Sequence, residues 1–384
     1  MRRLLIAPHE LLTGPDALEA LALRLAERLG PGAGTRLLLV HGERGYAAAR
    51  ERIDGALAVA GLAPARVEHR GPCSPAAIDA LVDSARAAGA AWLLGVGGGR
   101  VIDSAKAAAQ ALGLPFAVLP TSPATCAATA PTVVVYDAKG RHLEAREGGA
   151  GAALVALDAR LLAAAPDRLL AAGVADAWAK VHEVTLTTAG RPPGVTTGAA
   201  LALVAQLRAL LERDAVAALR SGPGGAAAAE LLDARQRVAE AVVALPGLIG
   251  GLAGADAKLA LAHPLHDALT AVPGAHAALH GEKVAFGTLV QLFLAGDGCD
   301  GGGADARADA FETEVARYAA LGIRCDLEGL GCSAARAPSG LDAVAANAFE
   351  DPAVGAALPR LTRPELRSAI EEVDQRLRRH AGLA

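Results

Sequence analysis

Histidines gather in one short stretch of this chain. Four of the ten lie in an Ala- and Leu-rich segment, at positions His263, His266, His276 and His280. His263 and His266 are three apart, so on a helix they share one face. A Pro-Gly pair at 273–274 ends that helix, and a second helix that starts near His280 could return its imidazole to the same point. Neutral imidazole is a common ligand of divalent transition metals, so the cluster indicates a metal site. The alternative is that His263 and His280 are core or helix-cap histidines that donate to backbone carbonyls.

Two imidazoles do not fill a metal site, so a carboxylate from elsewhere should complete it. The best candidate is Asp176 in the segment GVADAWAK, where small apolar residues surround it. A carboxylate in such surroundings is costly to bury unless it is paired or bound to a metal. Two other interpretations stay open: a helix cap near Gly173, or an i,i+4 partner of Lys180.

A glycine run, GVGGGRVIDSAK at 95–106, stands between an expected strand and an expected helix. Glycines at 97–99 let the backbone approach a phosphate, and a helix N-terminus offers free N–H groups. A dinucleotide pyrophosphate is the natural guest of Gly97, Gly98 and Gly99, although a bare tight turn would have the same pattern. Asp103 and Lys106 are either a surface i,i+3 pair or polar groups near the nicotinamide end of the cofactor.

A loop rich in small hydroxyl residues, PTSPATCAATAP at 120–131, follows the next expected strand. Loops after the carboxyl ends of parallel strands line the ligand crevice of an open α/β sheet. Thr121 and Ser122 therefore suit contacts to phosphate, ribose or carboxamide. A helix-capping loop is the competing interpretation.

The pattern of elements predicts two domains. Expected strands at 37–40, 65–69, 92–96 and 116–119 alternate with helical patterns at 13–30, 47–60, 74–88 and 101–111, which is typical of a parallel α/β sheet. Strands at 132–136 and 153–157 flank a polar turn and are expected to form a hairpin. Beyond about residue 160 nearly everything is predicted helical, with loops at 297–303 and 323–340. We therefore expect a dinucleotide-binding α/β domain over 1–160 and an all-α, metal- and substrate-binding domain over 161–384. The expected helices of the second domain are 159–165, 167–189, 195–213, 224–244, 248–270, 278–295, 306–321 and 363–380.

Composition excludes several classes of partner. The net charge of the 384 residues is −4, and no basic block is present, which argues against nucleic acid. The five cysteines are scattered, without a CxxC pair, as in a reduced, cytoplasmic protein. We expect neither a signal peptide nor a membrane span, because charges, Pro or Gly interrupt each apolar run.

The chain resembles the iron-containing (group III) alcohol dehydrogenase superfamily, in its glycerol dehydrogenase-like branch. Four motifs together carry the resemblance: GVGGGRVIDSAK, PTSPATCAATAP, GVADAWAK and AHPLHDALTAVPGAHAALHGEKVAFG. The resemblance implies the dehydroquinate synthase-like fold, an N-terminal Rossmann-like domain followed by a helical domain. It also implies NAD or NADP, one divalent metal (zinc or Fe(II)) and a homo-oligomer, a dimer or larger. By this resemblance the metal ligands are Asp176, His263 and His280, and His266 takes part in proton relay. The cofactor residues so implied are Gly97, Gly98, Gly99, Thr121, Ser122 and Tyr136.

Two departures from that pattern bear on specificity. Cys126 stands where glycerol dehydrogenases carry an aspartate that touches the polyol, and the Ala-Thr-Cys-Ala version resembles hydroxycarboxylate dehydrogenases, which reduce 2-oxo acids. The alternative interpretation of Cys126 is a small packing residue. Gly42 stands where NAD-preferring relatives often carry an aspartate, and with Arg44 it would accept a 2′-phosphate. Glu43 could supply the acidic role itself, or both charges could be solvated, so the sequence favours NADP(H) only slightly.

The expected reaction is reversible hydride transfer between a nicotinamide and a small secondary alcohol or 2-hydroxy acid, with a metal as Lewis acid. Glycerol or another polyol is the alternative substrate. A rival of another class is a carbocycle-forming lyase of the dehydroquinate synthase type, which would use several Lys and Arg residues for a phosphorylated substrate. A silent binding protein on the same scaffold is the third possibility.

Overall fold

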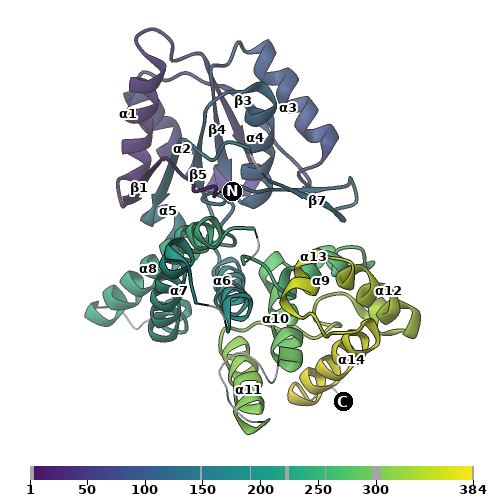
Figure 1. The fold of residues 1–384 in the computed structure, drawn as a ribbon. Helices are drawn as coiled ribbons and strands as arrows, with labels where there is room; N and C mark the ends of the chain where they lie inside the picture. The colour runs from purple at the N-terminus through teal and green to yellow at the C-terminus, as the bar shows by residue number, and fades with distance from the viewer. Residues whose placement is uncertain are drawn as a thin grey trace. The chain divides into compact units, whose positions relative to one another are not determined.

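The computed structural model describes residues 4–147, 149–190, 192–220, 225–255, 257–295 and 304–382, so the expected loop at 297–303 lies outside them. The chain divides into two compact units, each made of two segments. Figure 1 labels their helices and strands and colours the chain by residue number. Unit 1 comprises Met1–Leu170 and Arg220–Gly251, and unit 2 comprises Ala171–Leu219 and Leu252–Ala384. The units are thus interleaved in sequence, unlike the expected domains 1–160 and 161–384. The division of labour expected for those domains, cofactor in the first and metal in the second, stays a prediction.

Unit 1 is built on a six-stranded parallel sheet in the order β1–β8–β5–β4–β2–β3, which confirms the predicted α/β class. The central strands are continuous apolar runs, the pattern of strands buried on both faces. The strands are β1 (Glu10–Gly14), β2 (Leu37–His41), β3 (Ala65–Glu68), β4 (Trp92–Gly97), β5 (Phe116–Pro120) and β8 (Leu154–Asp158).

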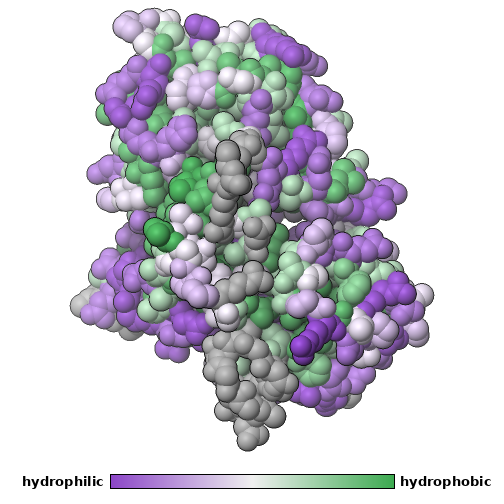
Figure 2. All heavy atoms as spheres, in the orientation of Figure 1, coloured by the Kyte–Doolittle hydropathy of each residue, from purple (hydrophilic) through white to green (hydrophobic). Residues whose placement is uncertain are grey.

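Helices cover both faces of this sheet. α1 (Ala17–Leu29) and α2 (Glu43–Val59) share one apolar core with alternate residues of the strands, for example Leu21 and Ile53 with Leu39. On the other face α4 (Gly99–Leu112) packs against β4 and also against α3 (Pro75–Ala87). Hydrophilic residues gather over α1 and α3 in Figure 2, as expected for amphipathic helices whose apolar side faces a sheet.

The predicted hairpin is wrong in its second strand. β6 (Val133–Tyr136) pairs antiparallel with β7 (His142–Arg146), whereas the expected partner at 153–157 is β8 of the main sheet. The reason is burial: every residue of β8 is buried, and a strand buried on both faces belongs inside a parallel sheet. β7 (HLEAR) is polar and mostly exposed, so its apolar content gave no signal.

The order of the strands reverses between β2 and β4. From β2 the chain moves outward to β3, then returns to the other side of β2 to form β4 and β5. Ligands of open α/β sheets bind outside the carboxyl ends of the strands at such a switch point. Gly42 follows β2, and the run Gly97 to Gly99 closes β4, so both glycine segments lie at this point.

Beyond β8 the described chain is helical, as predicted. One long helix, α8, runs through Pro246 where two helices were expected, and α9 is separate from it. α12 and α13 were not expected as helices. The α-helices are α5 (Ala159–Ala163), α6 (Asp167–Thr188), α7 (Val195–Asp214), α8 (Gly225–Ala253), α9 (Ala262–Leu269), α10 (His280–Ala295), α11 (Ala304–Ala320), α12 (Pro338–Phe349), α13 (Pro352–Ala357) and α14 (Arg363–His380).

By length and composition, α7 alone among the helices of the described residues could cross a membrane. Its buried residues include Ala200, Val204, Leu207 and Leu211, which recur every three or four positions. Such a stripe is typical of a helix that packs one face on a protein core.

Lys106 is a fully buried cation that ties α4 to the loop after β5. Its ammonium donates to three backbone oxygens and to the Asp103 carboxylate, and Asp103 also accepts from the N–H of Val134 at 3.2 Å. Four partners share the three N–H donors of this ammonium. The two residues are therefore a buried pair and not the surface pair considered from sequence, and they fix the loop and β6. Their expected place near the nicotinamide end of a cofactor stays a prediction. The distances from Lys106 Nζ are 2.9 Å to Ala127 O, 2.9 Å to Ala130 O, 2.8 Å to Thr132 O and 3.1 Å to Asp103 Oδ1.

We predict that Lys106→Met lowers the free energy of unfolding by roughly 3 kcal/mol, because it leaves a buried carboxylate and three carbonyls without their cation. Urea denaturation measures the change. Lys139→Met, at an exposed lysine of the β6–β7 turn, is the matched control and should stay within about 0.5 kcal/mol. Equal stability of the two variants would show that the Lys106 contacts contribute little.

Candidate metal centre and cofactor loops

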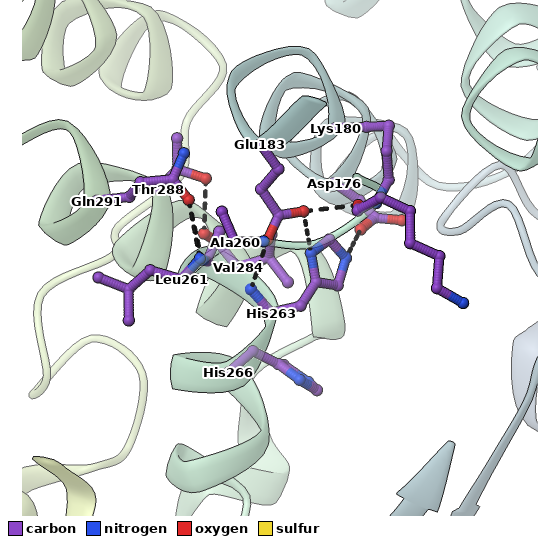
Figure 3. A network of polar contacts seen from close by, with 12 residues as sticks. Asp176, Lys180, Glu183, Ala260, Leu261, His263, His266, Val284, Thr288 and Gln291 are labelled. Carbon is purple, nitrogen blue, oxygen red and sulfur yellow. Dashed lines mark hydrogen bonds and ion pairs between the residues drawn. The ribbon is translucent and has the colours of Figure 1, made fainter. Parts of the chain in front are cut away.

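Asp176, His263 and His280 come together in unit 2. They offer one ligand atom each, and these atoms lie within 4.8 Å of one another. Asp176 projects from the middle of α6, His263 from the first turn of α9, and His280 is the first residue of α10. Both imidazoles turn Nε2 toward Asp176 Oδ1, at 3.3 Å from His263 and 3.2 Å from His280 (Figure 3 shows the His263 side). The convergence predicted from spacing is therefore present.

Close helix packing brings the three side chains together. A Cβ on Gly281 would lie 1.8 Å from the carbonyl oxygen of Ala172, so α10 approaches the backbone of α6 directly after His280. A Cβ on Gly287 would lie 2.4 Å from the carbonyl oxygen of Ala262, which places α10 equally close to the start of α9. Only glycine permits backbones to approach this closely.

The N-terminus of α9 is buried, and side chains from two other helices cap its N–H groups. Glu183 of α6 accepts two of them through Oε1, and the amide oxygen of Gln291 on α10 accepts two more. Pro264, in the first turn, has no N–H to satisfy, so it is tolerated at the start of the helix. The distances are 3.0 Å (Ala260 N) and 3.2 Å (His263 N) on Glu183, and 3.1 Å (Leu261 N) and 3.3 Å (Ala262 N) on Gln291.

Two carboxylates share the charge balance of the cluster. Burial alone would raise the pKa of Asp176, but the imidazoles of His280 and His263 outweigh it and hold that pKa well below its usual value. Burial likewise opposes ionisation of Glu183, yet His263 and Lys180 lower its pKa to about 2. His263 behaves in the opposite sense: burial lowers its pKa, but Glu183 and Asp176 raise it to about 9 overall. A donor set with buried negative charge and two inward Nε2 atoms fits a divalent cation.

His266 lies against the same cluster. Its side chain is 2% exposed, its Nε2 lies 3.0 Å from Nδ1 of His280, and its Nδ1 lies 2.9 Å from Asp267 Oδ1. His266 thus contacts the nitrogen of His280 that does not face Asp176. This geometry does not by itself favour the proton relay that the resemblance implied. His276 is exposed in a 3-10 turn at 275–277.

Lys180 was considered from sequence as a simple partner of Asp176. Its ammonium instead donates to the carbonyl oxygen of Lys258 at 2.5 Å and lies 3.4 Å from Glu183 Oε2. Neither Glu183 nor Gln291 was predicted from the sequence as part of this site. The available signal for Glu183 was its position seven residues after Asp176, two turns along the same face of a helix.

In unit 1 the glycine segments lie against the hydroxyl-rich loop. The α4 N-cap is Gly98 and the α2 N-cap is Gly42, so neither helix N-terminus carries a capping side chain. A Cβ on Gly98 would contact Ser122 Oγ at 3.4 Å, and one on Gly99 would contact Thr125 Oγ1 at 3.0 Å. The N-termini of two helices, both capped by glycine, thus lie close to a loop of hydroxyl groups. This arrangement suits a phosphate-bearing ligand.

The remaining predicted residues are also placed. The N–H of Thr121 donates to Gly97 O at 3.0 Å, and a Cβ on Gly45 would lie 2.1 Å from its hydroxyl, a close approach that sequence analysis missed. Cys126 is half-buried and opens a turn in which its carbonyl oxygen accepts from Thr129 and Ala130. Tyr136 ends β6, with its ring edge-on to His142 at 6.1 Å.

The charges beside Gly42 are exposed at the start of α2. Glu43 is 63% exposed and lies 3.8 Å from Arg70, while Arg44 is exposed beside it. A surface ion pair such as Glu43–Arg70 contributes little to stability, so the charges of Glu43 and Arg44 can both respond to a ligand.

Comparison with known proteins gives one consistent family. The iron-containing alcohol dehydrogenase family matches residues 8–159. The chain is 34% identical over 333 residues to a glycerol dehydrogenase of Escherichia coli O6:H1, covering 86% of this chain and 85% of that protein. It is 32% identical over 263 residues to hydroxycarboxylate dehydrogenase A of Escherichia coli K12, covering 68% of this chain and 71% of that protein.

Among solved structures, a probable glycerol dehydrogenase from Sinorhizobium meliloti 1021 matches with a TM-score of 0.77 at 28% identity, over 99% of this chain and 100% of that chain. The fold and the resemblance predicted from four motifs are thereby confirmed. The chain belongs to the iron-containing alcohol dehydrogenase family, as a metal-dependent, NAD(P)-linked oxidoreductase that acts on CH–OH groups.

Proposed function

We propose that Asp176, His263 and His280 hold the catalytic divalent metal of this dehydrogenase. The observation that carries the proposal is the turning of both Nε2 atoms toward one buried carboxylate oxygen. Three protein ligands leave coordination positions open, as a catalytic site requires. Imidazole and carboxylate ligands serve both zinc and Fe(II), so the proposal covers either ion.

We propose a 2-oxo acid and its 2-hydroxy acid as the substrate pair. Cys126 brings no fixed negative charge to the loop of residues 120–131, so an anionic substrate meets less repulsion there than it would from an aspartate. The hydroxycarboxylate dehydrogenase relative supports this class. Glycerol or another polyol is the second candidate, supported by the greater coverage of the glycerol dehydrogenase relative.

The proposed reaction moves a hydride between nicotinamide C4 and the carbinol carbon. When bound, the coenzyme exchanges the hydride and the metal supplies Lewis-acid polarisation of the substrate oxygen. Gly42, Gly97, Gly98 and Gly99 would admit the phosphates of the coenzyme, with Thr121, Ser122 and Tyr136 beside them. His266 would take part in proton transfer through the hydrogen-bonded chain that runs from His280 through His266 to Asp267.

Two further expectations belong to this proposal. We expect a cytoplasmic enzyme, since the scattered cysteines suit a reducing compartment. We also expect a homo-oligomer, a dimer or larger, as the resemblance implied. Size-exclusion chromatography with light scattering measures the second directly.

We predict that chelation abolishes turnover and that one metal, zinc or Fe(II), restores it. The assay follows NADH and NADPH absorbance with a panel of 2-oxo acids and polyols, before and after metal is added back. Asp176→Asn should stay inactive after metal is added. Full activity in excess chelator would contradict the metal proposal, while no net change in NAD(P)H with any substrate would favour the lyase alternative.

We predict that Cys126→Asp shifts preference toward polyols. The new carboxylate repels an anionic 2-oxo acid and accepts hydroxyl protons, so the ratio of kcat/KM for glycerol to that for the 2-oxo acid should rise about tenfold or more. Cys126→Ser is the matched neutral control and should leave the ratio near that of the unmodified enzyme. An unchanged ratio in Cys126→Asp would mean that this position does not select the substrate.

A further inference from the structure

The ring of His263 is held from both sides by carboxylates of the same helix. Its Nε2 lies 3.3 Å from Asp176 Oδ1, and its Nδ1 lies 2.7 Å from Glu183 Oε2. Figure 3 shows the imidazole lying between these two acidic side chains of α6. Asp176 has an assigned task in the proposed metal centre, whereas Glu183 has none.

We propose that Glu183 is a positioning residue that fixes His263 as an Nε2 ligand of the metal. The inference rests on the metal centre proposed above and adds a residue that would not touch the metal itself. A histidine that binds metal through one nitrogen commonly donates its other N–H to a carboxylate, which sets the tautomer and the ring orientation.

The direction of this hydrogen bond follows from the chemistry of the partners. An ionised carboxylate can only accept, so the Nδ1 of His263 must carry the hydrogen in the 2.7 Å contact. In the neutral imidazole the lone pair then resides on Nε2, the nitrogen that faces Asp176. Glu183 thereby selects the tautomer that a metal at Asp176 requires.

Glu183 also fixes the backbone that carries this ring. Its Oε1 accepts from the N–H of Ala260 at 3.0 Å and from the N–H of His263 itself at 3.2 Å. The ring and the main chain of one residue are therefore anchored to a single carboxylate. Because the side chain of Glu183 is fully buried, water is not at hand to replace it, and Lys180 lies beside it at 3.4 Å as a counter-charge.

The substitution Glu183→Gln tests this arrangement with almost no change of shape. Glutamine has one acceptor oxygen and one NH₂ donor, but Glu183 receives donors on both oxygens. If the glutamine oxygen keeps the backbone N–H groups, its NH₂ faces Nδ1 and favours the tautomer with hydrogen on Nε2. That hydrogen would occupy the nitrogen that should bind metal.

Unit 2 offers a matched control. Glu314 is also buried beside a histidine, with His182 Nε2 at 3.1 Å from its Oε1, but it is separate from the three proposed ligands. Glu314 also pairs with the cation of Arg317, as Glu183 pairs with that of Lys180, so Glu314→Gln removes one buried negative charge from a histidine and a cation, as Glu183→Gln does. Any general cost of such a change appears in both variants, whereas the loss of His263 positioning appears in one.

The experiment measures the dissociation constant for Zn²⁺ by chelator competition with the full-length protein, without any activity assay. We expect Glu183→Gln to weaken Zn²⁺ binding by about 10- to 100-fold and Glu314→Gln to stay within about twofold. The visible absorption bands of the Co²⁺-loaded protein give the second readout, because they report the ligand geometry. They should shift in Glu183→Gln and not in Glu314→Gln.

The variant Asp176→Asn separates the two proposals. If it binds Zn²⁺ as tightly as the unmodified protein, the proposed metal centre is wrong, and the role of Glu183 falls with it. If Asp176→Asn binds weakly but Glu183→Gln keeps full affinity and unshifted Co²⁺ bands, the positioning role alone is overturned. Should Glu183→Gln fail to fold, the double substitution Lys180→Met with Glu183→Gln, which removes both buried charges, carries the same expectation and the same contrary result.

Discussion

Unit 2 depends on the contact of two buried carboxylates of α6, Asp176 and Glu183, with opposite nitrogens of the His263 ring. Each charge would cost several kcal/mol to bury alone, and the contact makes their burial tolerable because each faces a donor. Glu183 also meets the N-terminus of α9, where a negative charge is favoured by the helix dipole. One interaction thus joins two helices, satisfies the start of one of them and aims a ring nitrogen.

Unit 1 differs in that backbone, rather than side chains, is presented to the proposed ligand. Its glycines lie at the N-termini of α2 and α4, where the strand order reverses, and the loop after β5 crosses beside them. That loop carries Cys126 and is held from beneath by the buried ammonium of Lys106. Cys126, the residue proposed to select the substrate, therefore lies in a loop whose backbone is fixed by a buried cation.

Spacing and residue type were enough to predict the candidate metal ligands, because histidines and a lone carboxylate stand out in Ala-rich helices. Glu183 does not stand out, since a glutamate in a long helix is ordinarily a solvated residue, and only the packing of α9 shows it to be buried. The burial of Lys106 was not predicted for the same reason: its sequence pattern contains no record of the three carbonyl oxygens around it. The hairpin error arose because β6 and β8 are equally apolar, while the true partner β7 is polar. Side-chain chemistry was thus readable from the sequence, but burial and long-range pairing were not.

The central claim is that a divalent metal is bound by Asp176 together with His263 and His280. Anomalous X-ray diffraction from crystals of the metal-loaded protein, collected at the absorption edge of the metal, tests it most directly. We expect a peak among these three side chains, with Nε2 of both histidines about 2.0–2.1 Å from the ion if it is zinc and Glu183 still hydrogen-bonded to Nδ1 of His263. A peak ligated through Nδ1 of His263, or a metal bound elsewhere with this cluster empty, would contradict it.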